Sequence, residues 1–204
     1  MNYVEDLLPE TLIAAPGCPE TIVERALRTS AAEFYRETQA WRVTTDVSPV
    51  IKGQRDVELE LPRDTILTRL FWVKLAGKPL KAISERNLSD EMGTPRGYAA
   101  SGSSRTLQLD VIPEQTWARD GVTAHMAVVP TYKLDLIDDD MFLAHRQGIL
   151  YGAIRNLLTL PNVPWGNLQD AQTYAILQQS EKAQAKSTAE ALRSAVVRTV
   201  RYGG

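Results

Sequence analysis

The sequence holds few of the side chains that most often carry chemistry at a protein site. Its 204 residues include one cysteine, Cys18, and two histidines, His125 and His145. A lone cysteine cannot form a disulfide within the chain, which fits synthesis in a reducing compartment. A zinc site built from Cys and His would need more ligands than these, unless carboxylates completed it. We therefore expect no bound metal and no cofactor.

Charge of one sign and long apolar runs are also missing. The chain has 23 Lys and Arg against 25 Asp and Glu, so its formal net charge is −2. That balance excludes a polybasic nucleic-acid binder, whose affinity for phosphates requires a large positive excess. No run of 18 apolar residues occurs, and the first six residues lack the basic and apolar regions of a secretory signal. The sequence thus predicts a globular protein with no membrane partner.

The common catalytic motifs are absent as well. The chain contains no G-x-x-x-x-G-K-[ST], no G-x-G-x-x-G, no G-x-S-x-G and no H-E-x-x-H. These absences favour a structural or binding protein over an enzyme. The hydrophobic content of 44% is ordinary for a globular protein, and the length suits one domain.

The N-terminal part predicts an irregular segment followed by a helix. Residues 1–19 carry Pro9, Pro16, Gly17 and Pro19, which are spaced too closely for a helix. From Glu20 to about Trp41, apolar side chains recur every three or four positions, which indicates one helical face. The members of that face are Val23, Leu27, Ala31, Phe34, Thr38 and Trp41.

Residues 43–136 change character, because alternation replaces the helical period. In residues 57–61 apolar side chains alternate with carboxylates, as in a strand with one solvated face. Further strands are predicted around 66–75, 80–83, 106–111 and 122–130, with one helical turn within 84–93 and a flexible segment at 97–104. Four to six strands joined by short turns predict a small antiparallel sheet.

Two helices follow, at about 138–160 and 167–197. Asp138 and Asn167 occupy N-cap positions, and Asp170 follows Asn167 in a near capping-box arrangement. The first helix carries a stripe of small residues, Ala144, Gly148 and Gly152, at intervals of four. Interior glycines cost about 1 kcal/mol each relative to alanine, so the stripe implies close approach of a neighbouring helix.

The second of these helices carries a thin seam with alternating spacings of four and three. The seam consists of Ala171, Ala175, Gln178, Lys182, Ala185, Ala189, Leu192 and Val196. Most of these side chains are small and two are polar, so the seam buries too little area to hold a long helix alone. It must pack against the first helix, the glycine-bearing helix or another subunit.

The predicted fold is therefore α+β in a single domain. A helical base of three main helices comprises residues 20–42 and 138–197, with an antiparallel β-rich insertion at 43–136. An extended C-terminal arm covers residues 198–204.

Several residues allow both a chemical and a structural interpretation. The triplet Asp138–Asp140 could line a channel or bind a divalent cation, but an N-cap with favourable charge explains it more simply. His145 could meet Asp139 or Asp140 only loosely, and no nucleophile accompanies it. We expect His125 to be a solvated strand residue.

Cys18 and the aromatic residues of the first helix also allow both a chemical and a structural interpretation. Cys18, at a helix start, could have a lowered thiol pKa, but a structural position there is the favoured interpretation. Phe34, Tyr35 and Trp41 are expected in or near the core, since a base-stacking platform would need a basic groove beside them.

Three segments together resemble the head-to-tail adaptor (connector, neck) proteins of tailed bacteriophages. The first is Pro16-Gly17-Cys18-Pro19-Glu20, which opens the first helix. The second, Gly148–Trp165, reads GILYGAIRNLLTLPNVPW and is similar to the second helix of these proteins and its Pro-Trp turn. The third is Asp170–Tyr174 with the long Gln-, Ala- and Lys-rich helix behind it. The resemblance covers most of the chain in order and is one of pattern and length.

The resemblance implies a structural virion protein at the neck, made in the host cytoplasm and without enzymatic activity. Such adaptors form a homo-oligomeric ring, commonly of twelve copies, beneath the portal protein. The ring extends the DNA channel, through which double-stranded DNA passes without sequence-specific binding, and offers a surface to tail or nozzle proteins.

The resemblance also assigns roles to particular residues. Arg193, Arg198, Arg201 and Tyr202 match the C-terminal segment that reaches the portal, and this basic segment would order on an acidic groove. The alternative is that these arginines only complement the helix C-terminal dipole. Packing between helices or subunits falls to Ala144, Gly148, Gly152, Ala185, Ala189 and Leu192.

Two other functions remain open from the sequence. One is a tail terminator or another head-completion ring protein. The other, from a different class, is an enzyme or nucleic-acid-binding regulator with an unrecognised site in the β region, around Arg86 to Arg105.

Overall fold

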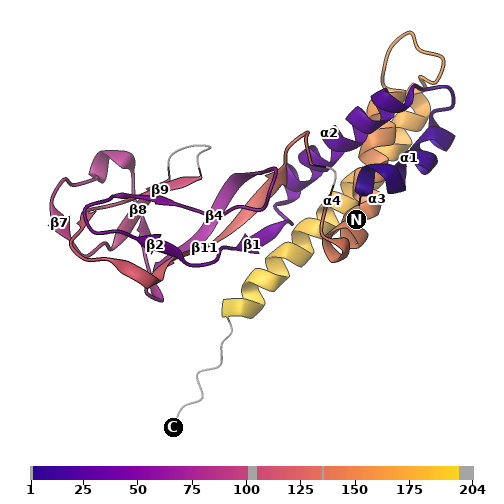
Figure 1. Cartoon of the computed structure of the whole chain (residues 1–204). Helices are drawn as coiled ribbons and strands as arrows, with labels where there is room; N and C mark the ends of the chain where they lie inside the picture. The colour runs from indigo at the N-terminus through magenta and orange to yellow at the C-terminus, as the bar shows by residue number, and fades with distance from the viewer. Residues whose placement is uncertain (1, 101–104, 135, 198–204) are drawn as a thin grey trace. The chain divides into compact units, whose positions relative to one another are not determined.

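The computed structural model describes residues 2–100, 105–134 and 136–197, with the side chains of 192–197 left out (Figure 1). The chain divides into two compact units. A helical unit comprises Met1–Trp41 and Pro130–Gly204, and a β unit comprises Arg42–Val129. The fold is mixed α+β, as predicted.

The helices of the described residues belong to the helical unit, apart from one 3-10 turn. They are α1 (Tyr3–Ala14), α2 (Glu20–Thr38), α3 (Asp139–Leu158) and α4 (Leu168–Val197). None of the helices in this part of the chain combines the length and the apolar character needed to cross a membrane.

The prediction of an irregular segment before residue 20 was wrong, because α1 is helical despite Pro9. Asn2 caps this helix by accepting a hydrogen bond from the backbone N–H of Glu5 at 3.4 Å. An internal proline costs about 3 kcal/mol in an isolated helix. Tertiary contacts offset that cost: Tyr3 and Leu7 are fully buried, and α1 packs against α2 and α3.

Arg146 of α3 also binds α1, through hydrogen bonds to two of its carboxylates. Its guanidinium donates to Glu10 at 2.6 and 3.1 Å and to Asp6 at 3.2 Å. The hydrogen bonds from Arg146 lower the pKa of Glu10, so both partners are charged at neutral pH. Sequence periodicity gives no sign of this contact, because the partners are about 140 positions apart.

Helix α2 follows the predicted apolar period but ends three residues before Trp41. Gln39 adopts a left-handed conformation with φ of 52°, and its N–H bonds to the carbonyl of Tyr35. Trp41 is nevertheless buried, with its ring centroid 5.4 Å from that of Tyr35. The buried face of α2 includes Val23, Leu27, Ala31, Phe34 and Thr38.

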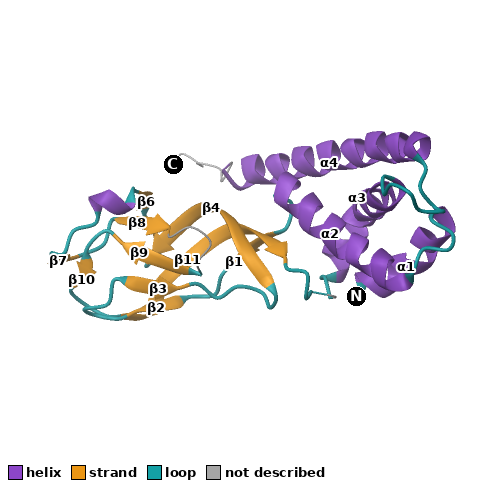
Figure 2. Cartoon of the chain, turned by 90° about the horizontal axis from the view of Figure 1, so that it is seen from above, coloured by secondary structure: helices purple, strands orange, loops and turns teal. Residues whose placement is uncertain are grey.

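Helices α3 and α4 form a hairpin whose caps match the predicted ones. The Asp138 carboxylate accepts from the N–H groups of Asp140 and Met141. Asn167 Oδ1 accepts from the N–H groups of Gln169 and Asp170, and its amide donates to the Asp170 carboxylate at 2.6 Å. Figure 2 shows the long α4 beside α2 and α3.

The two glycines of α3 lie where neighbouring helices come closest. A Cβ added to Gly148 would stand 2.2 Å from the Phe34 ring of α2. A Cβ on Gly152 would stand 2.1 Å from Gln178 Nε2 of α4 and 2.2 Å from Ser30 Oγ of α2. Larger side chains at either position would separate the three helices.

Two long strands, several short ones and one 3-10 turn form the regular structure described in the β unit. The strands are β1 (Arg42–Thr44), β2 (Ser48–Val50), β3 (Asp56–Glu58), β4 (Thr65–Leu75), β5 (Lys78–Pro79), β6 (Lys81–Ala82), β7 (Met92–Gly93), β8 (Gly97–Ala100), β9 (Thr106–Leu109), β10 (Ile112–Pro113) and β11 (Trp117–Pro130), and the turn is η1 (Glu85–Asn87).

The strands form three sheets rather than the one expected. The first has the order β1-β11-β4-β5, with β2 also paired to β11, and the second has the order β3-β9-β8-β6. Strands β7 and β10 form a separate pair. Antiparallel pairing dominates as predicted, but β6–β8 and β7–β10 are parallel. The expected flexible segment at 97–104 was wrong for residues 97–100, which form β8, while 101–104 lie outside the described residues.

Gly148→Ala tests the close packing of α2 on α3. Phe34 is fully buried and cannot move aside without disturbing its neighbours, so overpacking should outweigh the better helix propensity of alanine. We expect the free energy of unfolding to fall by about 1–2 kcal/mol in urea titrations. Gln147→Ala, at the exposed neighbouring position, should leave stability within about 0.5 kcal/mol of wild type. Equal stabilities for the two variants would contradict the packing.

Candidate interaction surfaces

The part of the α4 seam whose side chains are described is mostly buried within the helical unit. Gln178, Lys182, Ala185 and Ala189 are 1–4% exposed. Helix α4 packs along α3 and also contacts α2, so this part of the seam has partners within the chain. The seam is therefore no evidence for a neighbouring subunit, although the sequence left that possibility open.

Polar groups bind the three long helices together along this seam. Ser30 of α2 donates to the Ile149 carbonyl of α3 at 2.7 Å. Arg155 of α3 donates to Gln178 Oε1 at 2.7 Å and to Glu33 of α2 at 3.2 Å. The sequence showed polar residues at seam positions, but it gave no sign of their partners.

Lys182 has a buried side chain whose ammonium group forms an ion pair with Glu37. It is 3% exposed, and its Nζ lies 2.9 Å from Glu37 Oε1 of α2. Glu37 itself is about half exposed. A buried ammonium depends on such a partner, because its charged form is strongly disfavoured away from water.

The residues predicted for packing do not all share one environment. Gly148 and Gly152 are buried against α2 and α4, but Ala144 is exposed and takes no part in that packing. Ala185 and Ala189 are buried. Leu192 and Arg193 fall in the last turns of α4 where side chains are not described, and Arg198, Arg201 and Tyr202 lie outside the described residues.

The two residues considered for reactive chemistry near α2 and α3 have structural surroundings. Cys18 is buried, and burial raises the pKa of its thiol, opposite to the shift that activates a nucleophile. His145 is half-buried with its ring 5.3 Å from Phe34 and 5.8 Å from Tyr35. Burial lowers the pKa of His145, so the ring is neutral at pH 7.

No cluster suited to a metal ion occurs among the described residues: none of their His, Cys, Asp and Glu side chains form a group of three or more. Asp138 instead uses its carboxylate as the α3 cap.

Large apolar side chains remain exposed elsewhere on the helical unit. Ile13 at the end of α1 is 80% exposed, and Leu168 and Ile176 of α4 are 68% and 73% exposed. A groove of about 510 Å³ lies between these helices, with walls formed by Ala14, Tyr151, Leu158, Asp170, Thr173, Tyr174 and Leu177. This groove and the three exposed residues are called the α1–α4 surface below.

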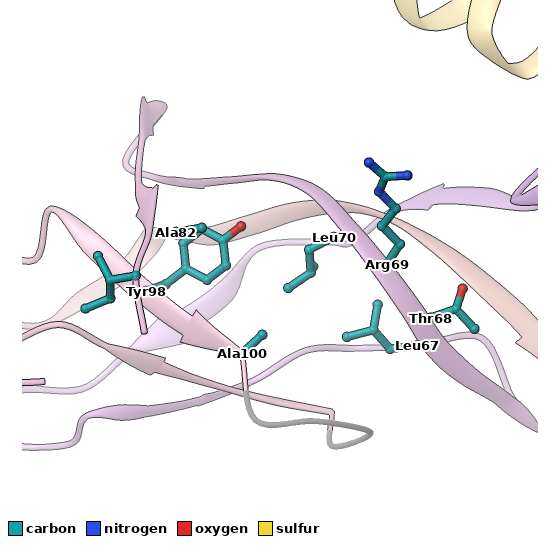
Figure 3. Close-up of a pocket in the computed structure, with 8 residues that line it drawn as sticks. Leu67, Thr68, Arg69, Leu70, Ala82, Tyr98 and Ala100 are labelled. Atoms are coloured by element: carbon teal, nitrogen blue, oxygen red, sulfur yellow. The ribbon is translucent and has the colours of Figure 1, made fainter. Parts of the chain in front are cut away.

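The β unit has a shallow pocket of about 260 Å³ between β4, β6 and β8. Its lining consists of Leu67, Thr68, Arg69, Leu70, Ala82, Ile83, Tyr98 and Ala100. Figure 3 shows the Tyr98 ring facing Leu70, while the Arg69 guanidinium points away from them. Only Tyr98 and Ala100 belong to the 86–105 region in which the sequence left a site open.

A cluster of cations and aromatic rings lies on the neighbouring strands β1, β4 and β11. The Arg42 and Arg69 guanidinium groups lie 4.4 and 5.5 Å from the Phe71 centroid. The Lys74 ammonium lies 4.5 Å from the Trp72 ring. Such contacts attract a cation to the face of an aromatic ring.

His125 of β11 lies beside this cluster and is half-buried between two buried neighbours, so it is a strand residue as predicted but less solvated than expected. Its ring stacks on Trp72 at 5.6 Å and lies 5.4 Å from Phe71. Nδ1 is 3.0 Å from Thr44 Oγ1. Burial and the Arg42 charge lower the pKa of His125, so the ring is neutral at pH 7.

A scan against protein-family models found no match for this chain, and a search of curated proteins found none either.

The Lys182–Glu37 pair predicts an asymmetric response to mutation. Glu37→Gln should lower the free energy of unfolding by about 1–2 kcal/mol, because it leaves a buried ammonium without its counter-charge; the half-exposed carboxylate keeps the loss below that of a fully buried pair. Lys182→Met replaces the buried side chain by an apolar one of similar shape and should be nearly neutral. Urea unfolding would measure both. A larger loss for Lys182→Met would contradict this account.

The half-buried His145 predicts a loss of stability in mild acid. Below pH ~6.5 the unfolded chain binds a proton at this ring, whereas the folded chain binds it only at lower pH. The free energy of unfolding should therefore fall as the pH drops from about 7.5 to 5.5. His145→Asn should show a smaller fall, and Gln147→Asn should behave as wild type. An unchanged pH dependence in His145→Asn would contradict the assignment.

Proposed function

We propose that the chain is a structural protein of a tailed-phage neck. In this proposal it is a head-to-tail adaptor that docks beneath the portal, extends the DNA channel and offers a surface for tail attachment. Copies assemble side by side into a ring and act without enzymatic activity. The sequence resemblance described above suggests this function.

The observation that carries the proposal is the exposed α1–α4 surface. Ile13, Leu168 and Ile176 leave large apolar side chains in water on α1 and α4, and these two helices border a groove lined in part by Tyr151 and Tyr174. Exposed apolar patches of this kind mark protein contacts. Ile176 lies about 140° around α4 from Ala171 of the buried seam, so a partner could reach it without displacing α2 or α3.

In this proposal, each part of the chain has its own role in the adaptor. Helices α2, α3 and α4 act as a helical base, and the β-rich stretch between α2 and α3 acts as an insertion that contacts other neck proteins. Residues 193–204 include three arginines and no acidic side chain. This arm would dock on an acidic groove of the portal, where its charge is complementary.

Ile176→Asp tests the proposal in the phage that encodes the chain. A phage defective in this gene should accumulate DNA-filled heads without tails, and plasmid-borne wild-type protein should restore plaques. Ile176→Asp should lower the plaque titre at least 100-fold while its unfolding temperature stays unchanged, since a carboxylate is costly in an apolar contact.

Gln179→Asp is the matched control, because Gln179 is an exposed residue of the same helix. It adds the same charge and should support wild-type titres. Full titres with Ile176→Asp would overturn the α1–α4 contact. Normally tailed heads in the defective phage would overturn the adaptor function itself.

A further inference from the structure

The helical unit has a second groove, between α2 and the end of α3, which is called the α2–α3 groove below. It encloses about 410 Å³. Ala26 and Leu157 are buried in its lining, whereas Ile22 and Leu160, which also line it, are each 38% exposed. The α2–α3 groove therefore combines a buried apolar lining with large apolar side chains left in water, as protein contact surfaces do.

This groove and the groove of the α1–α4 surface lie on roughly opposite sides of α3. Tyr151 and Leu158 line the groove of the α1–α4 surface, whereas Asn156 lines the α2–α3 groove. At about 100° per residue, Asn156 stands about 140° around α3 from Tyr151 and about 160° from Leu158. The helical unit of one copy can therefore meet two neighbours at once, one at each groove.

An exposed ridge of α2 forms one wall of the α2–α3 groove. Ile22, Arg25 and Thr29 follow one another at intervals of three and four residues, and all three are exposed and line the groove. A ridge of this kind packs into the groove between two helices of a partner. The groove between α1 and α4 offers such a space, and Leu177 in its lining is 40% exposed.

Arg25 gives the α2 ridge a positive charge that nearby carboxylates do not take up. Glu24, its neighbour in sequence, forms an ion pair with Arg28 at 3.2 Å. Glu33, which lines the same groove, forms an ion pair with Arg155 at 3.2 Å. A partner that covers the ridge must therefore supply a carboxylate to Arg25, because a cation buried without one is costly.

Asp170 supplies that opposite charge in the groove of the α1–α4 surface. Its exposed carboxylate accepts a hydrogen bond from Asn167 Nδ2 at 2.6 Å through one oxygen, and the other oxygen can accept from a guanidinium. Contact of either groove with a second copy of itself would bring two arginines or two aspartates together. Contact between the two different grooves pairs Arg25 with Asp170, so the charges favour it.

We propose that the α2 ridge of one copy packs into the groove between α1 and α4 of a second copy, with Arg25 bound to Asp170 of the partner subunit. Because the two surfaces differ, the contact is head-to-tail and can repeat around a ring, whereas a self-complementary contact would stop at a dimer. This inference rests on the proposed function and names the surface that completes the lateral contact.

Cysteine cross-linking in phage particles tests the contact. Cys18→Ser removes the one native thiol, and plasmid-borne protein complements the defective phage. Particles whose protein carries both Ile22→Cys and Leu177→Cys, treated with a short bismaleimide, should give a ladder of dimers and larger oligomers on denaturing gels. Either cysteine alone should give only monomer, because identical surfaces do not meet in a head-to-tail contact.

Ile22→Cys with Gln179→Cys is the matched control, because Gln179 is exposed and lies about 160° around α4 from Leu177. It should give no ladder. Monomer alone from Ile22→Cys with Leu177→Cys, in particles that contain the protein, would overturn the contact and leave the adaptor function standing. Dimers from Leu177→Cys alone would do the same. Particles that lack even the wild-type chain would overturn the proposed function itself.

Exchange of the two charges tests the ion pair without cysteines. Arg25→Asp and Asp170→Arg should each lower the plaque titre about tenfold, since each places like charges across the contact. The double variant restores an opposite pair and should recover most of the titre. A double variant no better than the single variants would overturn the pairing. Unfolding temperatures measured in parallel show whether each variant is folded.

Discussion

The close approach of α2 and α4 to α3 at Gly148 and Gly152 is the constraint on which the helical unit depends. Without a side chain at Gly152, Ser30 reaches the Ile149 carbonyl and Gln178 reaches Arg155. In a largely buried space, a donor or acceptor that loses its hydrogen-bond partner costs free energy of folding. The two glycines thus lower the helix propensity of α3 but allow α2 and α4 to pack closely against it.

This arrangement changes what the thin α4 seam implies. A seam of small and polar residues suggests a helix in need of an outside partner, but α2 and α3 already occupy it. Three of the large apolar side chains left in water, Ile13, Leu168 and Ile176, lie instead on α1 and α4. We propose that lateral assembly uses the α1–α4 surface.

Local patterns predicted much of the fold correctly. The apolar period identified α2, α3 and α4, and the N-caps at Asp138 and Asn167 are those of the structure. Each of these signals lies within a few residues of the element it specifies. Alternation likewise identified β3 and β9, whose burial alternates along the strand, and part of β11, while an apolar run marked β4.

The features that the sequence did not predict depend on contacts between residues far apart in the chain. Pro9 disfavours a helix at α1. The burial of Tyr3 and Leu7 and the hydrogen bonds from Arg146 nevertheless stabilise one there. His125 is half-buried rather than solvated, because β1 and β4 place Thr44 and Trp72 beside it. The cation and ring cluster was equally hidden, because three strands distant in sequence build it. The four charges between residues 65 and 84 were the one signal that could have found it.

Native mass spectrometry of the full chain mixed with the portal protein of the same phage tests the central functional claim most directly. A ring-forming adaptor predicts one complex that contains a fixed number of copies per portal ring, even where the chain alone is monomeric. An unbound monomer at all concentrations, or an open series of polymers, would contradict it.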